Sequence, residues 1–224
     1  LATTPAGKAT LPLRDFGYQL ARRGFVALCL GTPGGDAYHP DQAGAQCQPL
    51  AFLAYVAANA HTALTHLPNV DPARIGIVGH SYGGKWALFA SCLYDKFACA
   101  VWSDPGIVFD ETRTSINYQE PWYLGLDPTT TRPRGLVSAT APRTGAYAKL
   151  IAQGHDLHEL HALMAPRLLQ QLFALDRHPG EIRHQLGIAA VALAPAQATA
   201  RAIHIEATAT ATAGHHRGSK QGPI

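Results

Sequence analysis

The chain has 224 residues, of which 47% are hydrophobic and 15% charged, and its formal net charge is +3. This length suits one ordinary domain with a sizeable core. Because the net charge is small and Lys and Arg form no cluster, the composition does not favour binding to nucleic acid or to a membrane surface. No apolar run reaches the length of about 18 residues that a bilayer span needs, so we expect no membrane partner.

The four cysteines, Cys29, Cys47, Cys92 and Cys99, show neither a CxxC pair nor a zinc-like spacing. Three of them lie in apolar runs that resemble strands or helices. We therefore expect buried thiols that act as small hydrophobic side chains. The sequence implies neither a metal nor an organic cofactor.

The first half of the chain alternates between helix-like and strand-like segments. Apolar residues recur at helical spacing up to Arg23, and Gly24 is well placed to end that helix. The apolar run that follows is typical of a strand buried on both faces. The same pair of patterns recurs twice after a loop rich in Gly, Pro and Asp. We predict helices over 13–23, 53–66 and 84–94, and strands over 25–30, 74–79 and 97–103.

This alternation, with short links, predicts the α/β class with a parallel doubly wound sheet. The regular pattern is lost over residues 104–146, where prolines are interleaved with aromatic residues such as Phe109 and Tyr123. We expect this segment to form a packed excursion over the edge of the sheet. Helical spacing returns at Tyr147 and ends near Pro166.

The strongest chemical signal is Gly79-His80-Ser81-Tyr82-Gly83, a G-x-S-x-G pattern. It follows a predicted strand and opens a predicted helix. A serine at such a turn needs a strained backbone with neighbouring chain packed very close, and flanking glycines permit that crowding. We therefore predict that Ser81 is a nucleophile whose hydroxyl this turn lifts out of the sheet.

Residues 70–125, which include IGIVGHSYGGKWALFASC, resemble the serine-esterase and dienelactone-hydrolase-like branch of the α/β-hydrolase superfamily. The resemblance extends over residues 13–167 and is most specific around Ser81. It implies a serine hydrolase that cleaves a carboxylic ester through an acyl-enzyme, with a histidine as base and an acid that orients the histidine. It also implies that the backbone N–H of Tyr82 forms half of the oxyanion hole.

The run Ser81-Tyr82-Gly83-Gly84-Lys85 resembles the S-x-x-G-K pattern of glucuronoyl esterases. That resemblance implies that Lys85 helps to hold a sugar, so the expected partner is a small-molecule or carbohydrate ester substrate. The alternative for Lys85 is an ordinary exposed residue at the start of a helix.

The acid and the histidine are less clearly marked. Asp104 directly follows the third strand, where some branches of the family place the acid, although an aspartate before Pro105 is also typical of a turn. Asp110 and Glu111 are weaker candidates. We expect the histidines at 155, 158 and 161 to pack or to cap helix ends. The histidines available for catalysis by residue type alone are His178, His184, His204, His215 and His216.

The chain departs from the family after Arg167. Residues 168–175 suit a helix at least as well as a strand, and beyond them Ala, Thr, Arg and His accumulate while acids become rare. We therefore expect a hydrolase core over 1–167 and a non-matching, low-complexity-like segment over 168–224, so that the fold is incomplete at both ends. The alternative function is a truncated or non-catalytic α/β-hydrolase-like domain that lacks the catalytic histidine.

Overall fold

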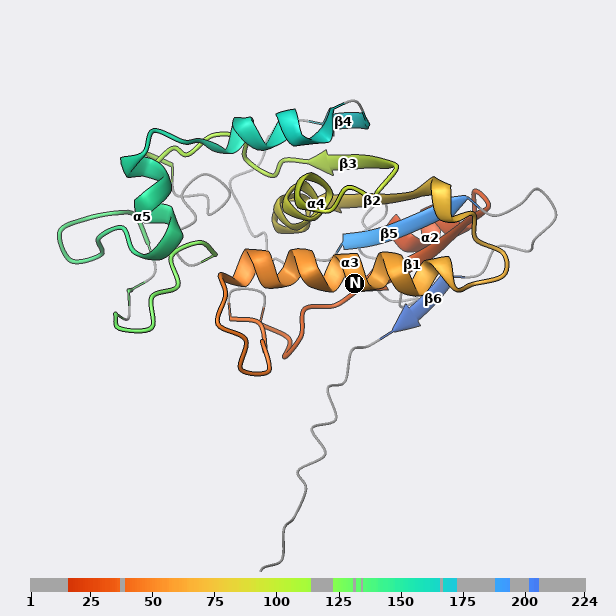
Figure 1. The fold of residues 1–224 in the computed structure, drawn as a ribbon, viewed down its shortest axis with the longest axis horizontal. Helices are drawn as coiled ribbons and strands as arrows, with labels where there is room; N and C mark the ends of the chain where they lie inside the picture. Colours follow the sequence, from red (N-terminus) through yellow and green to blue (C-terminus); the bar gives the residue numbers. More distant parts are fainter. Residues whose placement is uncertain are drawn as a thin grey trace, which may run out of the picture.

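The computed structural model describes residues 16–36, 39–113, 123–130, 132–133, 135–165, 167–172, 188–193 and 202–205. A six-stranded sheet in the order β4-β3-β2-β5-β1-β6 runs through its centre (Figure 1). The strands are β1 (Phe25–Leu30), β2 (Ile75–His80), β3 (Cys99–Ser103), β4 (Leu168–Leu172), β5 (Ile188–Leu193) and β6 (Ala202–Ile205).

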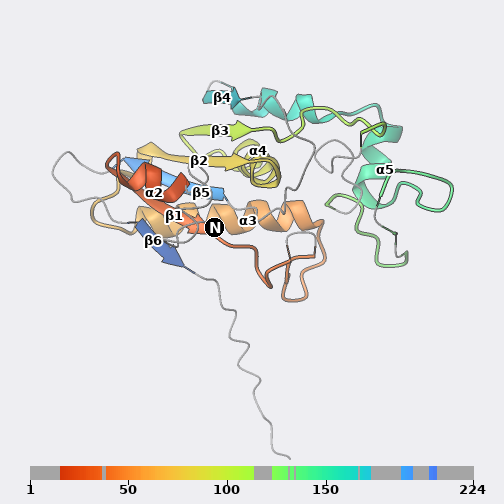
Figure 2. The same ribbon diagram turned by 180° about the vertical axis from the view of Figure 1, so that it is seen from behind.

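Helices cover both faces of this sheet, which confirms the predicted α/β class. The α-helices are α2 (Phe16–Ala21), α3 (Pro49–Thr65), α4 (Tyr82–Leu93) and α5 (Gly145–Ala152). Helices α3 and α4 pack against each other on one face, whereas α2 lies on the other face (Figure 2). Gly24 follows α2 with a φ of 91°, in the left-handed region where glycine is suited to end a helix. Among the described residues, no helix is both long enough and apolar enough to cross a bilayer.

The segment after α5 differs from the single helical stretch that its spacing predicted. It holds a 3-10 helix, η2 (Leu157–Met164), separated from α5 by a turn in which Gly154 has a φ of 76°. The Asp156 side chain accepts a hydrogen bond from the Leu157 amide, and Glu159 bonds back to the Asp156 amide. This capping box starts a new helical segment and therefore splits the predicted helix in two.

The sheet is parallel except at one position. Strands β2, β3 and β4 pair in parallel, as do β1 and β6. The crossover from β1 through α3 to β2 passes over one position, and β5 fills it antiparallel to both neighbours. A strand in that place satisfies the inner N–H and C=O groups of both β1 and β2. The sheet therefore has parallel pairs on both sides of β5, and β5 itself makes it mixed.

The chain after Arg167 also contributes more structure than we expected. Residues 168–175 suited a helix at least as well as a strand, but Leu168–Leu172 forms strand β4 beside β3. The open edge of β3 presents a row of unpaired backbone groups, and pairing with them outweighs the helical preference of Leu and Gln. The division of the chain at residue 167 stays a prediction.

Helix α4 is the most buried element of the described fold. Trp86, Ala87, Leu88 and Ala90 have no exposed surface, because α4 packs against β2, β3, α3 and η2 at once. The indole N–H of Trp86 donates a hydrogen bond to the carbonyl of Leu53 on α3. A helix that is enclosed on all sides is a rigid support for the residues at its N-terminal end.

The described part of the segment 104–146 packs against α4 and α5. Tyr123 is fully buried, and its ring lies 4.5 Å from that of Tyr82, centroid to centroid. Phe109 meets Tyr147 edge to face at 4.9 Å. These contacts fix the excursion to the start of α4 and to α5.

The cysteine thiols are all free. Cys29 and Cys92 are buried, as expected, whereas Cys99 is partly buried. Burial raises the pKa of Cys92 to about 11 and also raises the pKa of Cys29. These thiols therefore pack as neutral groups at physiological pH.

Candidate active site

Ser81 is the single residue that links β2 to α4, in a sharp strand-to-helix turn. Its φ is 54° and its ψ is −120°, a conformation that costs a non-glycine residue about 1–3 kcal/mol. The surrounding contacts offset that cost. The Ser81 amide donates a 2.8 Å hydrogen bond to the carbonyl of Ser103, and the Ser81 carbonyl accepts one from the Lys85 amide at 3.0 Å.

The glycines around Ser81 are explained by close approach of the backbone. A Cβ atom on Gly79 would overlap the carbonyl oxygen of Gly83. A Cβ atom on Gly84 would lie 2.7 Å from the carbonyl oxygen of Ser103. The strand, the turn and the helix thus pack so tightly that larger residues at these two positions would force the backbone apart.

Asp104 lies beyond the C-terminal end of β3, as Ser81 lies beyond the C-terminal end of β2. Strands β2 and β3 are parallel neighbours, and His80 pairs with Ser103 at the end of both. Ser81 and Asp104 therefore directly follow the last paired residues of two adjacent strands. Asp104 also has a left-handed backbone, with a φ of 53°. Two non-glycine residues of unusual backbone conformation thus stand side by side.

The two weaker acid candidates have structural partners. Asp110 accepts hydrogen bonds from Thr112 and Arg113 within its own turn. Glu111 accepts from the guanidinium of Arg143 at 2.6 and 2.5 Å, and from the buried Tyr147 hydroxyl at 2.8 Å. The hydrogen bond from Arg143 is the main reason why the pKa of Glu111 is lowered. Both carboxylates stabilise loops rather than stand at the end of β3.

The remaining two predicted site residues lie in the first two turns of α4. Tyr82 is fully buried, and its amide belongs to the first turn, whose N–H groups have no acceptor within the helix. Lys85 is also fully buried, so the alternative of an exposed residue at the helix start is wrong. Its ammonium donates a hydrogen bond to the carbonyl of Gly106 at 3.3 Å.

Three of the described histidines contact other side chains. The His80 ring contacts the Ser103 hydroxyl at 3.1 Å. As we expected, His155 pairs with Glu159 at 2.8 Å, and His161 stacks on Trp102 with ring centroids 5.6 Å apart.

His204 lies in β6, in register with Cys29 on β1. Strand β6 is three strand spacings from β2, or about 14 Å. That separation removes His204 from the candidates for the base. The other candidate histidines, His178, His184, His215 and His216, lie outside the described residues.

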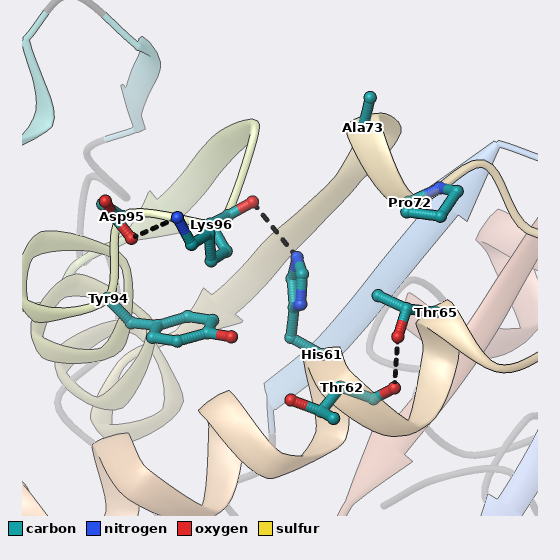
Figure 3. Close-up of a pocket in the computed structure, with 8 residues that line it drawn as sticks. All are labelled: His61, Thr62, Thr65, Pro72, Ala73, Tyr94, Asp95 and Lys96. Carbon is teal, nitrogen blue, oxygen red and sulfur yellow. Dashed lines mark hydrogen bonds and ion pairs between the residues drawn. The ribbon is translucent and has the colours of Figure 1, made fainter.

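A cavity of about 470 Å³ lies at the other end of strands β2 and β3. Figure 3 shows the residues that line it. It is lined by residues from α3, from the turn before β2 and from the segment between α4 and β3. His61, which the sequence analysis did not single out, is buried there, and its Nε2 lies 3.1 Å from the carbonyl of Lys96. Burial lowers the pKa of His61. The cavity adjoins the N-terminal ends of β2 and β3, and is therefore separate from Ser81.

No three side chains of His, Cys, Asp or Glu gather closely enough to hold a metal ion in the part of the chain that the structure describes. The polar groups at this end of β2 and β3 include the Ser81 hydroxyl, the Asp104 carboxylate and the backbone amides of the first turn of α4. Such a set suits acyl chemistry with a serine nucleophile.

Part of the chain is similar to a known protein family. Residues 55–153, from α3 to just past α5, match the prolyl oligopeptidase family, whose members are α/β hydrolases. No curated protein matches the chain. Among solved structures, the glucuronoyl esterase from Solibacter usitatus is similar at 24% identity with a TM-score of 0.42, over 61% of this chain and 34% of that chain. The chain thus spans about a third of the length of that esterase. The match thus places residues 55–153 beside a family of α/β hydrolases, and the helices on both faces of the sheet are consistent with it.

Proposed function

We propose that this α/β-hydrolase core is the catalytic part of a serine hydrolase that cleaves a carboxylic ester, with Ser81 as nucleophile. The Ser81 oxygen bonds to the acyl carbon, the alcohol leaves with a proton from the base, and water then releases the acid from the acyl-enzyme. The main support for this proposal is the strained backbone of Ser81 at the N-terminal end of α4. It places a hydroxyl group where the end of a helix favours negative charge.

Asp104 and Tyr82 supply the next two parts of this proposal. Asp104 stands at the end of the strand beside Ser81, where a carboxylate could orient a histidine between them. The Tyr82 amide is the N–H that directly follows the nucleophile, and it would bind the oxyanion of the tetrahedral intermediate. The positions of both residues in the fold support these roles.

The proposal requires a histidine that takes the proton of Ser81. Without such a base, a serine hydroxyl loses most of its nucleophilic activation, and catalysis falls by several orders of magnitude. Since His204 is too far away, the candidates are His178, His184, His215 and His216. If none of them reaches Ser81, the chain is a hydrolase-like domain without turnover.

The decisive test is covalent labelling by a fluorophosphonate probe. We expect the wild-type chain to be labelled and Ser81→Ala to remain unlabelled. Ser138→Ala is the matched control, because Ser138 lies in an exposed loop and should leave labelling intact. A folded wild-type chain that takes up no probe would support the alternative, a non-catalytic domain.

The leaving group separates esterase from peptidase. The match to the prolyl oligopeptidase family favours a peptide bond as the second candidate substrate. A p-nitrophenyl ester and a peptide p-nitroanilide distinguish the two, because an amide needs far more help for its leaving group. We expect Ser81-dependent release from the ester. Equal or faster release from the peptide would favour the peptidase.

A further inference from the structure

Lys85 occupies a position that is unfavourable for a cation. Its side chain has no exposed surface, and burial of an ammonium group is costly unless its hydrogen bonds are satisfied. Lys85 is also the fourth residue of α4, near the end of the helix that carries partial positive charge. Two separate effects thus disfavour the charge, so its contacts inside the protein must offset both.

One hydrogen bond of Lys85 leads to the turn that holds Asp104. Helical side chains lean toward the N-terminal end of their helix. For α4 this end adjoins the C-terminal ends of β2 and β3, which Ser81 and Asp104 follow. The ammonium donates a hydrogen bond to the carbonyl of Gly106 at 3.3 Å. Gly106 is two residues after Asp104 and has a φ of 68°.

The start of α4 touches the same turn at two further points. The Ser81 amide bonds to the Ser103 carbonyl at 2.8 Å. At Gly84 the helix comes so close that an added Cβ would lie 3.4 Å from the Cβ of Pro105. Contacts from Ser81, Gly84 and Lys85 therefore reach the residues on both sides of Asp104.

We propose that Lys85 is a positioning residue that holds the turn 104–106 against α4 and thereby sets where Asp104 stands relative to Ser81. The catalytic consequence rests on the proposed function, whereas the clamp itself does not. A misplacement of about 1 Å in a catalytic group can lower the rate by roughly a hundredfold. A fully buried ammonium is suited to this task rather than to contact with a sugar.

The clamp is tested first without any activity, by amide hydrogen exchange read by mass spectrometry. Lys85→Met keeps the length of the side chain and removes the ammonium, and Lys85→Arg keeps the charge. Lys149→Met, at an exposed position on α5, is the matched control. We expect roughly tenfold faster exchange over 103–106 in Lys85→Met, because a hydrogen bond from a charged group is lost, and recovery in Lys85→Arg. Unchanged exchange over 103–106 in a folded Lys85→Met would overturn the proposal.

A variant that keeps a neutral donor covers the case in which Lys85→Met fails to fold. Lys85→Gln retains an N–H group at shorter reach, so it should show faster exchange over 103–106 than the wild type. Exchange at the wild-type rate there would overturn the clamp.

Ester hydrolysis then separates positioning from substrate contact. If Lys85 positions Asp104, Lys85→Met lowers kcat by at least about tenfold and leaves KM within about twofold of the wild type. A raised KM with unchanged kcat would instead assign Lys85 to the substrate and overturn the proposal. If the wild type shows no labelling and no hydrolysis, the proposed function fails, and the exchange data alone decide whether the clamp exists.

Discussion

The main-chain amide of Ser81 and the carbonyl of Ser103 form a 2.8 Å hydrogen bond that continues the pairing of β2 and β3 into the turns beyond them. This bond joins two turns of left-handed backbone, at Ser81 and at Asp104. Strain of this kind persists only where the surrounding structure fixes it. The tight contacts of α4 are what fix it here.

Gly79→Ala tests this tight packing. The new methyl group would overlap the carbonyl of Gly83, which belongs to the backbone of α4 and cannot turn away. We expect the free energy of unfolding to fall by about 1–3 kcal/mol, as in other overpacked sites, and the Ser81 hydroxyl to lose reactivity toward the probe. Urea unfolding measures the first effect. Gly31→Ala is the control, because no atom lies within 4 Å of a Cβ there, and an equal loss in both variants would contradict the argument.

The sequence predicted the elements around Ser81 well because their signals are local. Glycine spacing, the apolar strand and the helix after it are all encoded within about twenty residues of each other. The burial of Lys85 was missed, because a lysine at a helix start is normally exposed and only the tertiary fold encloses α4 on all sides. His61 could have been found: Ala57, Ala60 and Leu64 lie on the same helical face, which is the buried one.

The position of β5 in the sheet could not be predicted from the sequence, for a different reason. Strand pairing joins residues that are far apart in the chain, and Val26 pairs with Ala192. Nothing in a short run of alanine and β-branched residues specifies which edge it will join or in which direction. The same non-local choice decides why Leu168–Leu172 is a strand rather than a helix.

The ion pair of Glu111 and Arg143 should stabilise the excursion after β3. Glu111→Ala removes the acceptor of both Arg143 and the buried Tyr147 hydroxyl, and we expect a loss of about 1–3 kcal/mol in the free energy of unfolding. Glu111→Gln keeps an acceptor and should lose less. Chemical unfolding at neutral pH measures both variants. A larger loss in Glu111→Gln than in Glu111→Ala would contradict this role.

The ion pair of Glu111 and Arg143 should weaken in acid. The pKa of Glu111 is lowered in the folded protein from its usual 4.5, so its contribution is complete above that value and is lost as the pH falls through the folded pKa. The difference in stability between the wild type and Glu111→Ala should therefore stay constant from pH 7 to 5 and shrink below about pH 4.5. A difference that grows in acid would show that the sign is wrong.

His61 should make the protein less stable as the pH falls below neutral. Burial lowers its pKa from 6.5, so the unfolded chain takes up a proton before the folded one does, and stability is lost as the pH drops below about 6.5. His61→Phe keeps an aromatic ring against Tyr94 and Phe97 and should flatten this dependence. Urea unfolding at pH 7.5, 6 and 5, roughly spanning the titration range, measures the slope. His161, whose pKa burial also lowers, adds a second contribution, so His61→Phe/His161→Phe should be flatter still.

Arg167, the last residue of the family resemblance, should be part of the folded core. Its guanidinium donates to the carbonyls of Ser91 at 2.8 Å and Tyr94 at 3.3 Å, at the negative end of α4, and to that of Leu163 on η2 at 2.8 Å. Arg167→Met leaves these carbonyls without that donor, and we expect a loss of about 1–3 kcal/mol in the free energy of unfolding. Arg74→Met, at an exposed position, is the control. If both variants unfold at the wild-type urea concentration, Arg167 does not fasten α4 to η2, and the hydrolase core would end before it.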